Sequence, residues 1–367
     1  MKLPPFEMER WQSTWEQRVA VNLSESGVEP IALDELLSED DLRALLRTPL
    51  GYAPTQGSAE LREAVAGLYP DCGPENVLLT TGSAEANLLG TLATAERDAP
   101  FVTVLPNYMQ VWGLAQTWGK AVPLWLRERR SWQPNPEEVK AVVSPGTTAL
   151  SLSHPNNPTG AALTTETRRA LLEAAEDVGA WILSDEVYRG AERVGEETPS
   201  LWGASERVLV TSGLSKAYGL PGLRLGWVCG PASLVERLWA LHDYTTIALN
   251  QLADILGRRA LGPWRENLLH RARSILRRNF PVLESFVQEN RMEWIPPAAG
   301  AIAFLRYPWK IPSLELAERA RDAGVLLVPG AHFQEEGYVR LGYGMDRETL
   351  TEGLDLLQPV FDEVAGA

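Results

Sequence analysis

Cysteine and histidine are scarce in this chain of 367 residues. The two cysteines, Cys72 and Cys229, lie far apart in the sequence, and Cys229 sits in an apolar run. A disulfide framework is therefore not expected, and a reducing compartment, the cytoplasm, is predicted. No two of the four histidines are three or four residues apart, so the sequence offers no metal-ligand spacing and predicts no metal site.

Long apolar runs and an excess of positive charge are also absent. No stretch approaches the roughly 20 apolar residues that a membrane-spanning helix needs, and Met1 to Arg18 lacks the apolar centre of a signal peptide. Basic residues number 34 against 48 acidic ones, which gives a formal net charge of -14. Such a chain repels phosphates and anionic lipids, so neither nucleic acid nor a membrane is an expected partner.

Short β-rich runs alternate with helical patterns through the middle of the chain. Most of these runs are apolar throughout and end in Gly, Pro, Ser or Asp, which is typical of strands buried on both faces. Thr165 to Val178 is a helical pattern that stops at Gly179. This alternation predicts an α/β fold with a mostly parallel sheet. The expected strands are Val77–Thr80, Phe101–Leu105, Val122–Leu126, Ala149–Leu152, Trp181–Ser184, Val208–Thr211 and Leu225–Val228.

The two ends of the chain predict a second, smaller α+β domain. Phe6–Ala20 reads as an amphipathic helix with Trp11 and Trp15 on one stripe, and we expect it to lie on a partner subunit. We expect residues 1–47 to form an N-terminal arm and part of the small domain, residues 48–240 the large domain, and residues 241–367 the rest of the small domain. The elements expected in the last part are a long helical region Leu234–Glu289, strands Ala301–Phe304, Leu326–Val328 and Tyr338–Leu341, and a helix Leu314–Asp322.

Two polar loops follow expected strands, at the sheet edge where open α/β folds bind ligands. Thr81–Asn87 contains a Gly-Ser-Ala turn that opens a helix, so its backbone N–H groups suit a phosphate. An ordinary helix cap by Ser83 is the alternative. In His154–Gly160, two prolines and a glycine frame Asn157, whose amide presents both a donor and an acceptor; a simple turn is the alternative.

Two further motifs add charge at the same edge. Asp185 ends a strand in Ser184–Tyr188, where its carboxylate can pair with a cation. In Gly213–Gly226, Lys216 lies among small residues and Arg224 follows eight positions later, where it suits a phosphate. A lysine can form a Schiff base with an aldehyde cofactor, and a carboxylate beside a pyridine nitrogen keeps that nitrogen protonated. Together the motifs meet the needs of pyridoxal 5'-phosphate (PLP).

The order and wording of these motifs resemble the class I/II, fold-type I PLP-dependent aminotransferases. The similarity runs from about Gly51 to Arg340 and rests on SKAYGLPGLRLGW, NNPTG and DEVY. The resemblance implies a large domain with a mostly parallel seven-stranded sheet, and a reaction that moves an amino group between an α-amino acid and a 2-oxo acid.

The resemblance also implies roles for individual residues. Lys216 would carry the Schiff base and move protons, and Asp185 would pair with the pyridine nitrogen. Tyr188 and Asn157 would bind the ring's phenolic oxygen, while Tyr108 would stack on the ring. The phosphate would be held by Ser83, Ala84 and Arg224, with Ser215 as a weaker candidate.

Other implied roles concern the substrate and a second subunit. Arg340, in YVRLGYG, would grip the substrate α-carboxylate with both arms of its guanidinium group, with Gly27 and Asn157 close by. Tyr52, in GYAPTQGSAELREAV, would reach the phosphate of the neighbouring subunit, which implies a homodimer with shared sites.

The chain departs from the common pattern at two places. Gly213 stands three residues before Lys216, where a phosphate-binding Ser or Thr is common in the family, and the N-terminal segment reads NLSESGVEP in place of a Gly-x-Pro turn. PPFEMERW, SESGVEP and DYTTIALNQLAD resemble the subgroup that contains capreomycidine synthase, which cyclises a hydroxylated arginine. A PLP-dependent cyclase or lyase is therefore the alternative activity, and a non-catalytic binding protein of the same fold is a second alternative.

Overall fold

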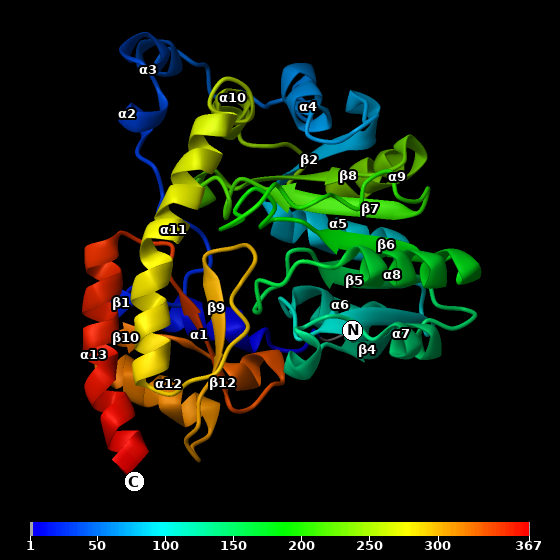
Figure 1. Ribbon diagram of the computed structural model, residues 1–367. Coiled ribbons are helices and arrows are strands. Elements are labelled where there is room, and N and C mark those ends of the chain that lie inside the picture. Colours follow the sequence, from blue (N-terminus) through cyan, green and yellow to red (C-terminus); the bar gives the residue numbers. More distant parts are fainter. Residues whose placement is uncertain (1–2, 367) are drawn as a thin grey trace.

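A seven-stranded sheet forms the centre of the larger part of the molecule (Figure 1). The computed structural model describes residues 3–366. Along the sheet the order is β2-β8-β7-β6-β5-β3-β4; β8 runs antiparallel to both of its neighbours and the other pairs are parallel. The mostly parallel α/β fold is thus confirmed. The strands are β2 (Val77–Thr81), β3 (Pro100–Leu105), β4 (Lys120–Trp125), β5 (Ala149–Ser153), β6 (Trp181–Asp185), β7 (Val208–Gly213) and β8 (Leu225–Cys229).

Helices cover both faces of this sheet. Side chains alternate between the faces along a strand, so Leu78 and Leu209 pack in one apolar cluster while Leu79 and Val210 pack in another. The first cluster lies under α5 (Ser83–Thr94), α6 (Gln110–Trp118) and α9 (Ala232–His242). Helices α4 (Ala59–Ala66), α7 (Pro136–Val142), α8 (Thr165–Val178) and α10 (Gln251–Leu261) contribute to the second. Because both faces are covered, the strands read as continuous apolar runs.

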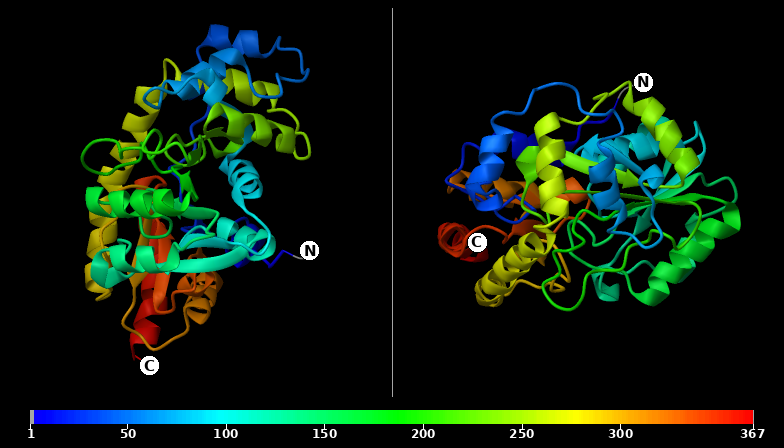
Figure 2. Two further views of the ribbon diagram at one scale, coloured as in Figure 1. Left: turned by 90° about the vertical axis from the view of Figure 1, so that its right-hand side faces the viewer. Right: turned by 90° about the horizontal axis from the view of Figure 1, so that it is seen from above.

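A smaller α+β part packs beside the large sheet (Figures 1 and 2). Its antiparallel sheet has the order β11-β12-β9, and a short parallel pair joins β1 to β10. The region expected to be one long helical stretch forms three helices, α9, α10 and α11, and the last of these runs alongside both parts. The remaining elements are β1 (Val21–Asn22), α2 (Leu33–Leu36), α3 (Glu39–Leu45), α11 (Arg265–Glu289), β9 (Ile302–Arg306), α12 (Ser313–Asp322), β10 (Val325–Leu326), β11 (Val328–Pro329), β12 (Tyr338–Gly342) and α13 (Arg347–Gly366).

The N-terminal helix α1 (Glu7–Trp15) differs from the sequence expectation in two respects. It ends at Trp15, five residues before Ala20. Its aromatic stripe is buried within its own chain: Trp11 packs with Ala317 and Leu326, and its indole N–H donates to the carbonyl of Leu327 over 2.7 Å. The expectation that this face lies on a partner subunit is therefore wrong. The helix is instead fastened to the small domain, which places its polar face over the large sheet.

None of the helices in residues 3–366 combines the length and the apolar character needed to cross a bilayer. The domain boundaries expected from the sequence stay a prediction.

Candidate active site

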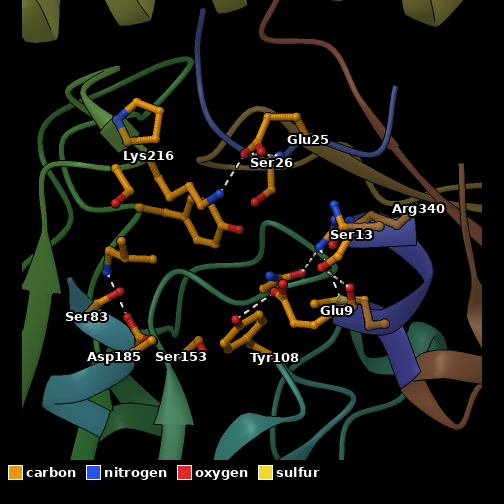
Figure 3. Close-up of a pocket in the computed structure, with 18 of the residues that line it drawn as sticks. Glu9, Ser13, Glu25, Ser26, Ser83, Tyr108, Ser153, Asp185, Lys216 and Arg340 are labelled. Atoms are coloured by element: carbon orange, nitrogen blue, oxygen red, sulfur yellow. Dashed lines mark hydrogen bonds and ion pairs between the residues drawn. The ribbon is translucent and has the colours of Figure 1, made fainter. Parts of the chain in front are cut away.

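A cavity of about 370 Å³ lies where the large sheet meets α1 and the small domain (Figure 3). Strands β5, β6 and β7 end at this cavity, so loops that are far apart in the sequence bring their polar side chains together there. Most of the residues singled out from the sequence line it, namely Ser83, Ala84, Tyr108, Asn157, Asp185, Tyr188, Ser215, Lys216, Arg224 and Arg340.

A helix N-terminus and a cation meet at the start of α5. The helix begins at Ser83 and its cap residue is Gly82, which has a positive φ of 78° and no side chain to cap the helix. Ser83 is therefore not the ordinary cap that was the alternative reading of this motif. A Cβ at Gly82 would crowd the guanidinium group of Arg224, so only glycine lets that cation lie beside the helix end.

Gly213 on β7 and Gly226 on β8 allow these two strands to pack closely against the start of α5. A Cβ at Gly226 would collide with the backbone of Gly82, and one at Gly213 would lie 2.9 Å from the carbonyl oxygen of Leu225. Close packing between β7 and β8 at the helix end thus explains why glycine stands at position 213, where Ser or Thr is common in the family. Arg224 also reaches Ser215, with a distance of 3.4 Å from Nη1 to Oγ.

Asp185 is held at the end of β6 by two donors. The amide of Asn87 donates to Oδ2 over 2.8 Å, and the backbone N–H of Val187 donates to Oδ1 over 3.1 Å. Asn87 is fixed in turn by the hydroxyl of Thr211, which donates to its amide oxygen over 2.6 Å. Burial raises the pKa of Asp185, and these hydrogen bonds together with Lys216 only partly oppose that rise. A carboxylate in this state gains from a cation that binds next to it.

Two tyrosines line the cavity near this carboxylate. Tyr188 is only 1% exposed, and burial raises the pKa of its hydroxyl. Tyr108 donates its hydroxyl to Oε1 of Glu9 over 2.7 Å, and burial, followed by the Glu9 charge, raises its pKa well above the usual range. Both phenols are therefore neutral hydrogen-bond donors at neutral pH.

Lys216 projects into the cavity from the loop after β7. Its Nζ lies 2.6 Å from Oε1 of Glu25, a residue that the sequence analysis did not single out. Burial alone would lower the pKa of Lys216, but the charge and hydrogen bond of Glu25 together with Tyr188 outweigh that effect and raise it. Gly27 does not line the cavity, although a Cβ there would lie 3.3 Å from Cδ of Lys216.

Arg340 on β12 is a buried cation, with 1% of its surface exposed. Its Nη1 donates to the amide oxygen of Asn157 over 3.0 Å, and its Nη2 donates to the carbonyl of Ser24 over 2.6 Å. Its Nε has no hydrogen-bond partner among the described residues. Burial lowers the pKa of this guanidinium group, so an anion bound beside it would relieve an unfavourable desolvation.

The polar face of α1 closes the cavity from the small-domain side. Glu9, Gln12, Ser13 and Glu16 lie at helical spacing and all line the cavity, with Glu25 beside them. The pKa of Glu16 is raised by burial and then by the neighbouring charges of Glu25 and Glu9. These residues were not predicted as site residues, because a polar stripe on a helix normally faces water. The only signal in the sequence was their helical spacing opposite Trp11 and Trp15.

Like Gly27, Tyr52 is a predicted site residue outside the lining of the cavity. It does not line the cavity, and 92% of its surface is exposed within this chain.

Comparison with known proteins agrees with this architecture. The model of the family "Aminotransferase class I and II" matches residues 32–357. The chain belongs to this family. Capreomycidine synthase from Streptomyces vinaceus is 31% identical to it over 96% of this chain and 92% of that protein. Aspartate/prephenate aminotransferase from Thermus thermophilus is 28% identical, with 92% of each chain covered. A crystal structure of a PLP-dependent aminotransferase from Streptococcus suis superposes with a TM-score of 0.93 at 31% identity, covering 99% of both chains.

The donor set of the cavity fits PLP, the cofactor that the resemblance to the family implies. The N-terminal end of α5 with Arg224 suits a dianionic phosphate, because the first backbone N–H groups of the helix and the guanidinium group both attract negative charge. Asp185 offers a buried carboxylate for the pyridine nitrogen, and the ring of Tyr108 offers an aromatic face. Lys216 supplies the amine for the aldehyde.

Proposed function

We propose that this chain is a PLP-dependent aminotransferase that moves an amino group between an α-amino acid and a 2-oxo acid. The observation that carries the proposal is the meeting, in one cavity, of the Lys216 amine, the buried Asp185 carboxylate and the buried Arg340 guanidinium group. These groups supply, in turn, an amine, an anion and a cation, which are the partners that an aldehyde, a pyridinium ring and a substrate carboxylate need.

Each cofactor-binding residue has a separate task in this proposal. The backbone N–H groups of Ser83 and Ala84, the hydroxyl of Ser215 and the guanidinium group of Arg224 hold the phosphate. Asp185 keeps the pyridine nitrogen protonated, and Asn87 prevents the carboxylate from turning away. Tyr108 lies against the ring, and Asn157 and Tyr188 donate to its phenolic oxygen. When bound, PLP supplies an aldehyde that condenses with an amine and a ring that accepts the electron pair released at the substrate's α-carbon.

The substrate is held by Arg340 and receives its proton transfers from Lys216. Arg340 binds the α-carboxylate with its planar fork, assisted by Asn157, which already contacts Nη1. Since Arg340 is anchored on β12 and by Ser24, it fixes the α-carbon relative to the Lys216 amine. Lys216 then takes a proton from one carbon and returns it to another, as a general base and acid.

Reconstitution and a half-reaction test the proposal. The protein with added PLP should be yellow, and borohydride should fix the cofactor to the peptide that contains Lys216. An amino acid should then change the absorbance of the bound cofactor, and a 2-oxo acid should restore it. Attachment to another lysine would overturn the assignment of Lys216, and failure of every 2-oxo acid to restore the spectrum would argue against transamination.

A cyclase or lyase of the same fold is the second candidate, and the acidic side of the cavity favours it. Glu9, Glu16 and Glu25 suit a cationic group on the substrate side chain, and capreomycidine synthase is among the relatives of this chain. Incubation with basic amino acids, followed by mass spectrometry, separates the two activities. A transaminase gives the 2-oxo acid and needs an amino acceptor, whereas a cyclase or lyase gives its product without one.

The proposal includes a homodimer with shared active sites. Tyr52, Tyr244 and Ile247 expose large apolar surface, and the loop that carries the last two is clamped to Glu85 of α5 by the hydroxyl of Thr246 over 2.8 Å. The exposed loop of Tyr244 and Ile247 therefore lies next to the N-terminal end of the same helix. Sedimentation should give about twice the chain mass, and mixed inactive Tyr52→Ala and Lys216→Ala variants should regain activity, because a hybrid dimer keeps one intact site. A monomer would overturn this part of the proposal.

The cytoplasm is the compartment that we propose for this enzyme. The proposal rests on the scarcity of cysteine in the sequence, which offers no disulfide framework.

A further inference from the structure

Glu25 holds the amine of Lys216 from the small-domain side of the cavity (Figure 3). Its Oε1 accepts from Nζ of Lys216 over 2.6 Å and from the backbone N–H groups of Ser26 and Gly27 over 2.7 and 2.9 Å. Three donors thus converge on one carboxylate oxygen. An ordinary surface ion pair joins two mobile side chains, whereas here the backbone fixes the anion before the lysine reaches it.

The backbone that carries Glu25 is itself fastened to the site. The N–H of Gly342 donates to the carbonyl of Leu23 over 2.7 Å, and the N–H of Val28 donates to the carbonyl of Lys216 over 3.3 Å. A Cβ at Gly342 would collide with the carbonyl oxygen of Glu25, so only glycine at the end of β12 lets the segment lie this close. The segment NLSESGVEP, which departs from the Gly-x-Pro turn of many relatives, therefore delivers a carboxylate to the lysine.

The charges around the pair favour a protonated lysine. Lys216 faces Glu25, Tyr188 and Arg340, and among these Glu25 is the group that raises the lysine pKa most. Partial burial would raise the pKa of Glu25, but the Lys216 charge and the hydrogen bonds outweigh it and lower the pKa to about 2. Glu16 is the nearby carboxyl whose own pKa Glu25 raises, so the anion stays on Glu25.

We propose that Glu25 is a positioning residue that anchors the Lys216 nitrogen over the site and favours its protonated form. The inference rests on the proposed function only for the chemical task of Lys216. During proton transfer, Glu25 stabilises the lysine after it has taken a proton and holds it in reach of the carbon that receives the proton.

Selective acetylation tests the contact without any cofactor. Acetic anhydride reacts only with neutral amines, and Lys120, Lys140 and Lys310 are exposed and serve as internal references. In the cofactor-free full chain at pH 8, Glu25→Gln should raise the labelling of Lys216 relative to these lysines by about fivefold or more, since about one pKa unit changes the neutral fraction about tenfold. The amide oxygen can still accept from Ser26 and Gly27, so the segment is preserved. Glu29→Gln, an equal charge change on the same segment, should alter the ratio by less than about twofold.

The loaded enzyme gives a second, spectroscopic readout. The absorbance of bound PLP changes with pH as the nitrogen on Lys216 loses its proton, and Glu25→Gln should lower the midpoint by about one pH unit, while Glu29→Gln leaves it unchanged. An unchanged labelling ratio and an unchanged midpoint in Glu25→Gln would overturn the role of Glu25. Failure of the wild-type protein to bind PLP would instead overturn the proposed function, and the acetylation result would still decide the contact.

Discussion

The two sides of the active-site cavity are built in different ways. One side, which we call the strand-end side, consists of loops that follow β2, β5, β6 and β7, and each loop carries its polar residues in a short contiguous motif. The other side, the arm side, consists of one face of α1, whose polar residues lie at helical spacing, together with Glu25 and Ser26. The first side carries cations and amides together with Asp185, whereas the second carries the carboxylates Glu9, Glu16 and Glu25.

The difference suggests a division of tasks: the strand-end side relates to the reaction, and the arm side relates to the substrate. The strand-end side fits a cofactor that many enzymes of the family share, so its chemistry can be named from its residue types. The arm side contributes negative charge, which we propose acts on the substrate side chain and on Lys216. Four substitutions test the contrast, taken from the largest expected effect to the smallest.

Lys216→Ala should have the largest effect. The change removes the amine that meets the cofactor and the base that moves the proton, so we expect turnover to fall by several orders of magnitude. PLP should still bind weakly, because the phosphate site at Gly82 and Arg224 is untouched. Single-turnover kinetics and equilibrium dialysis measure the two quantities. Turnover within tenfold of the wild type would show that the reaction does not need the Lys216 amine.

Asp185→Asn should come next. A neutral amide cannot stabilise a protonated pyridine nitrogen, and in a site shielded from water the lost charge interaction amounts to several kcal/mol, or about 10²–10⁴-fold in kcat. The fold should survive, since the single amide oxygen can still accept from one of the two donors, Asn87 or Val187. Circular dichroism checks the fold, and steady-state kinetics check the rate. Near-normal turnover would mean that another group stabilises the ring.

Arg340→Lys should weaken the binding of amino acids and 2-oxo acids together by about 10- to 100-fold. A point charge replaces a planar fork, and the contacts with Asn157 and Ser24 are lost with it. Amines without a carboxylate are the control and should react almost as before. If both classes of substrate lost the same factor, the damage would be to the fold, and Arg340 would have no special role in carboxylate binding.

Tyr108→Phe should have the smallest effect, and it tests the link between the two sides. It keeps the aromatic ring but removes the 2.7 Å hydrogen bond to Glu9 on α1. A hydrogen bond to a charged group contributes about 1.5–3 kcal/mol, part of which water can replace, so KM should rise about three- to tenfold with little change in kcat. Glu9→Gln, which keeps an acceptor, should change KM less. A large fall in kcat would show that the hydroxyl belongs to the chemistry of the ring.

The sequence predicted the strand-end side well because local patterns carry that information. All seven strands of the large sheet begin and end within two residues of the expected positions, as with β5 at Ala149–Ser153. Continuous apolar runs specify buried strands, and parallel strands must place their carboxyl ends at one edge. Lys216, Asp185 and Asn157 therefore meet in one cavity, as the motif order indicated. Their roles, like that of Tyr52, stay predictions.

The arm side could not be predicted in the same way. Trp11 and Trp15 were read correctly as an apolar stripe, but the sequence does not state which surface covers it, and the small domain covers it. From the sequence, a polar stripe with Glu9 and Glu16 is expected to face solvent. Only the packing of α1 in the folded chain shows that it faces the cavity. No local pattern pointed to Glu25, because its place in the site depends on a contact with Lys216, which is 191 positions away in the sequence.

The sequence by itself determined the class of the fold, the edge of the sheet that carries the site and the residue types at that edge. These follow from short-range periodicity and from the chirality and direction of strands, which act within a few residues of each position. Only the tertiary structure decided that the polar face of α1 closes the cavity and that Glu25 meets Lys216. Those contacts depend on close packing between segments that are remote in the chain, such as Gly342 against Glu25, and no local pattern encodes which remote surfaces meet.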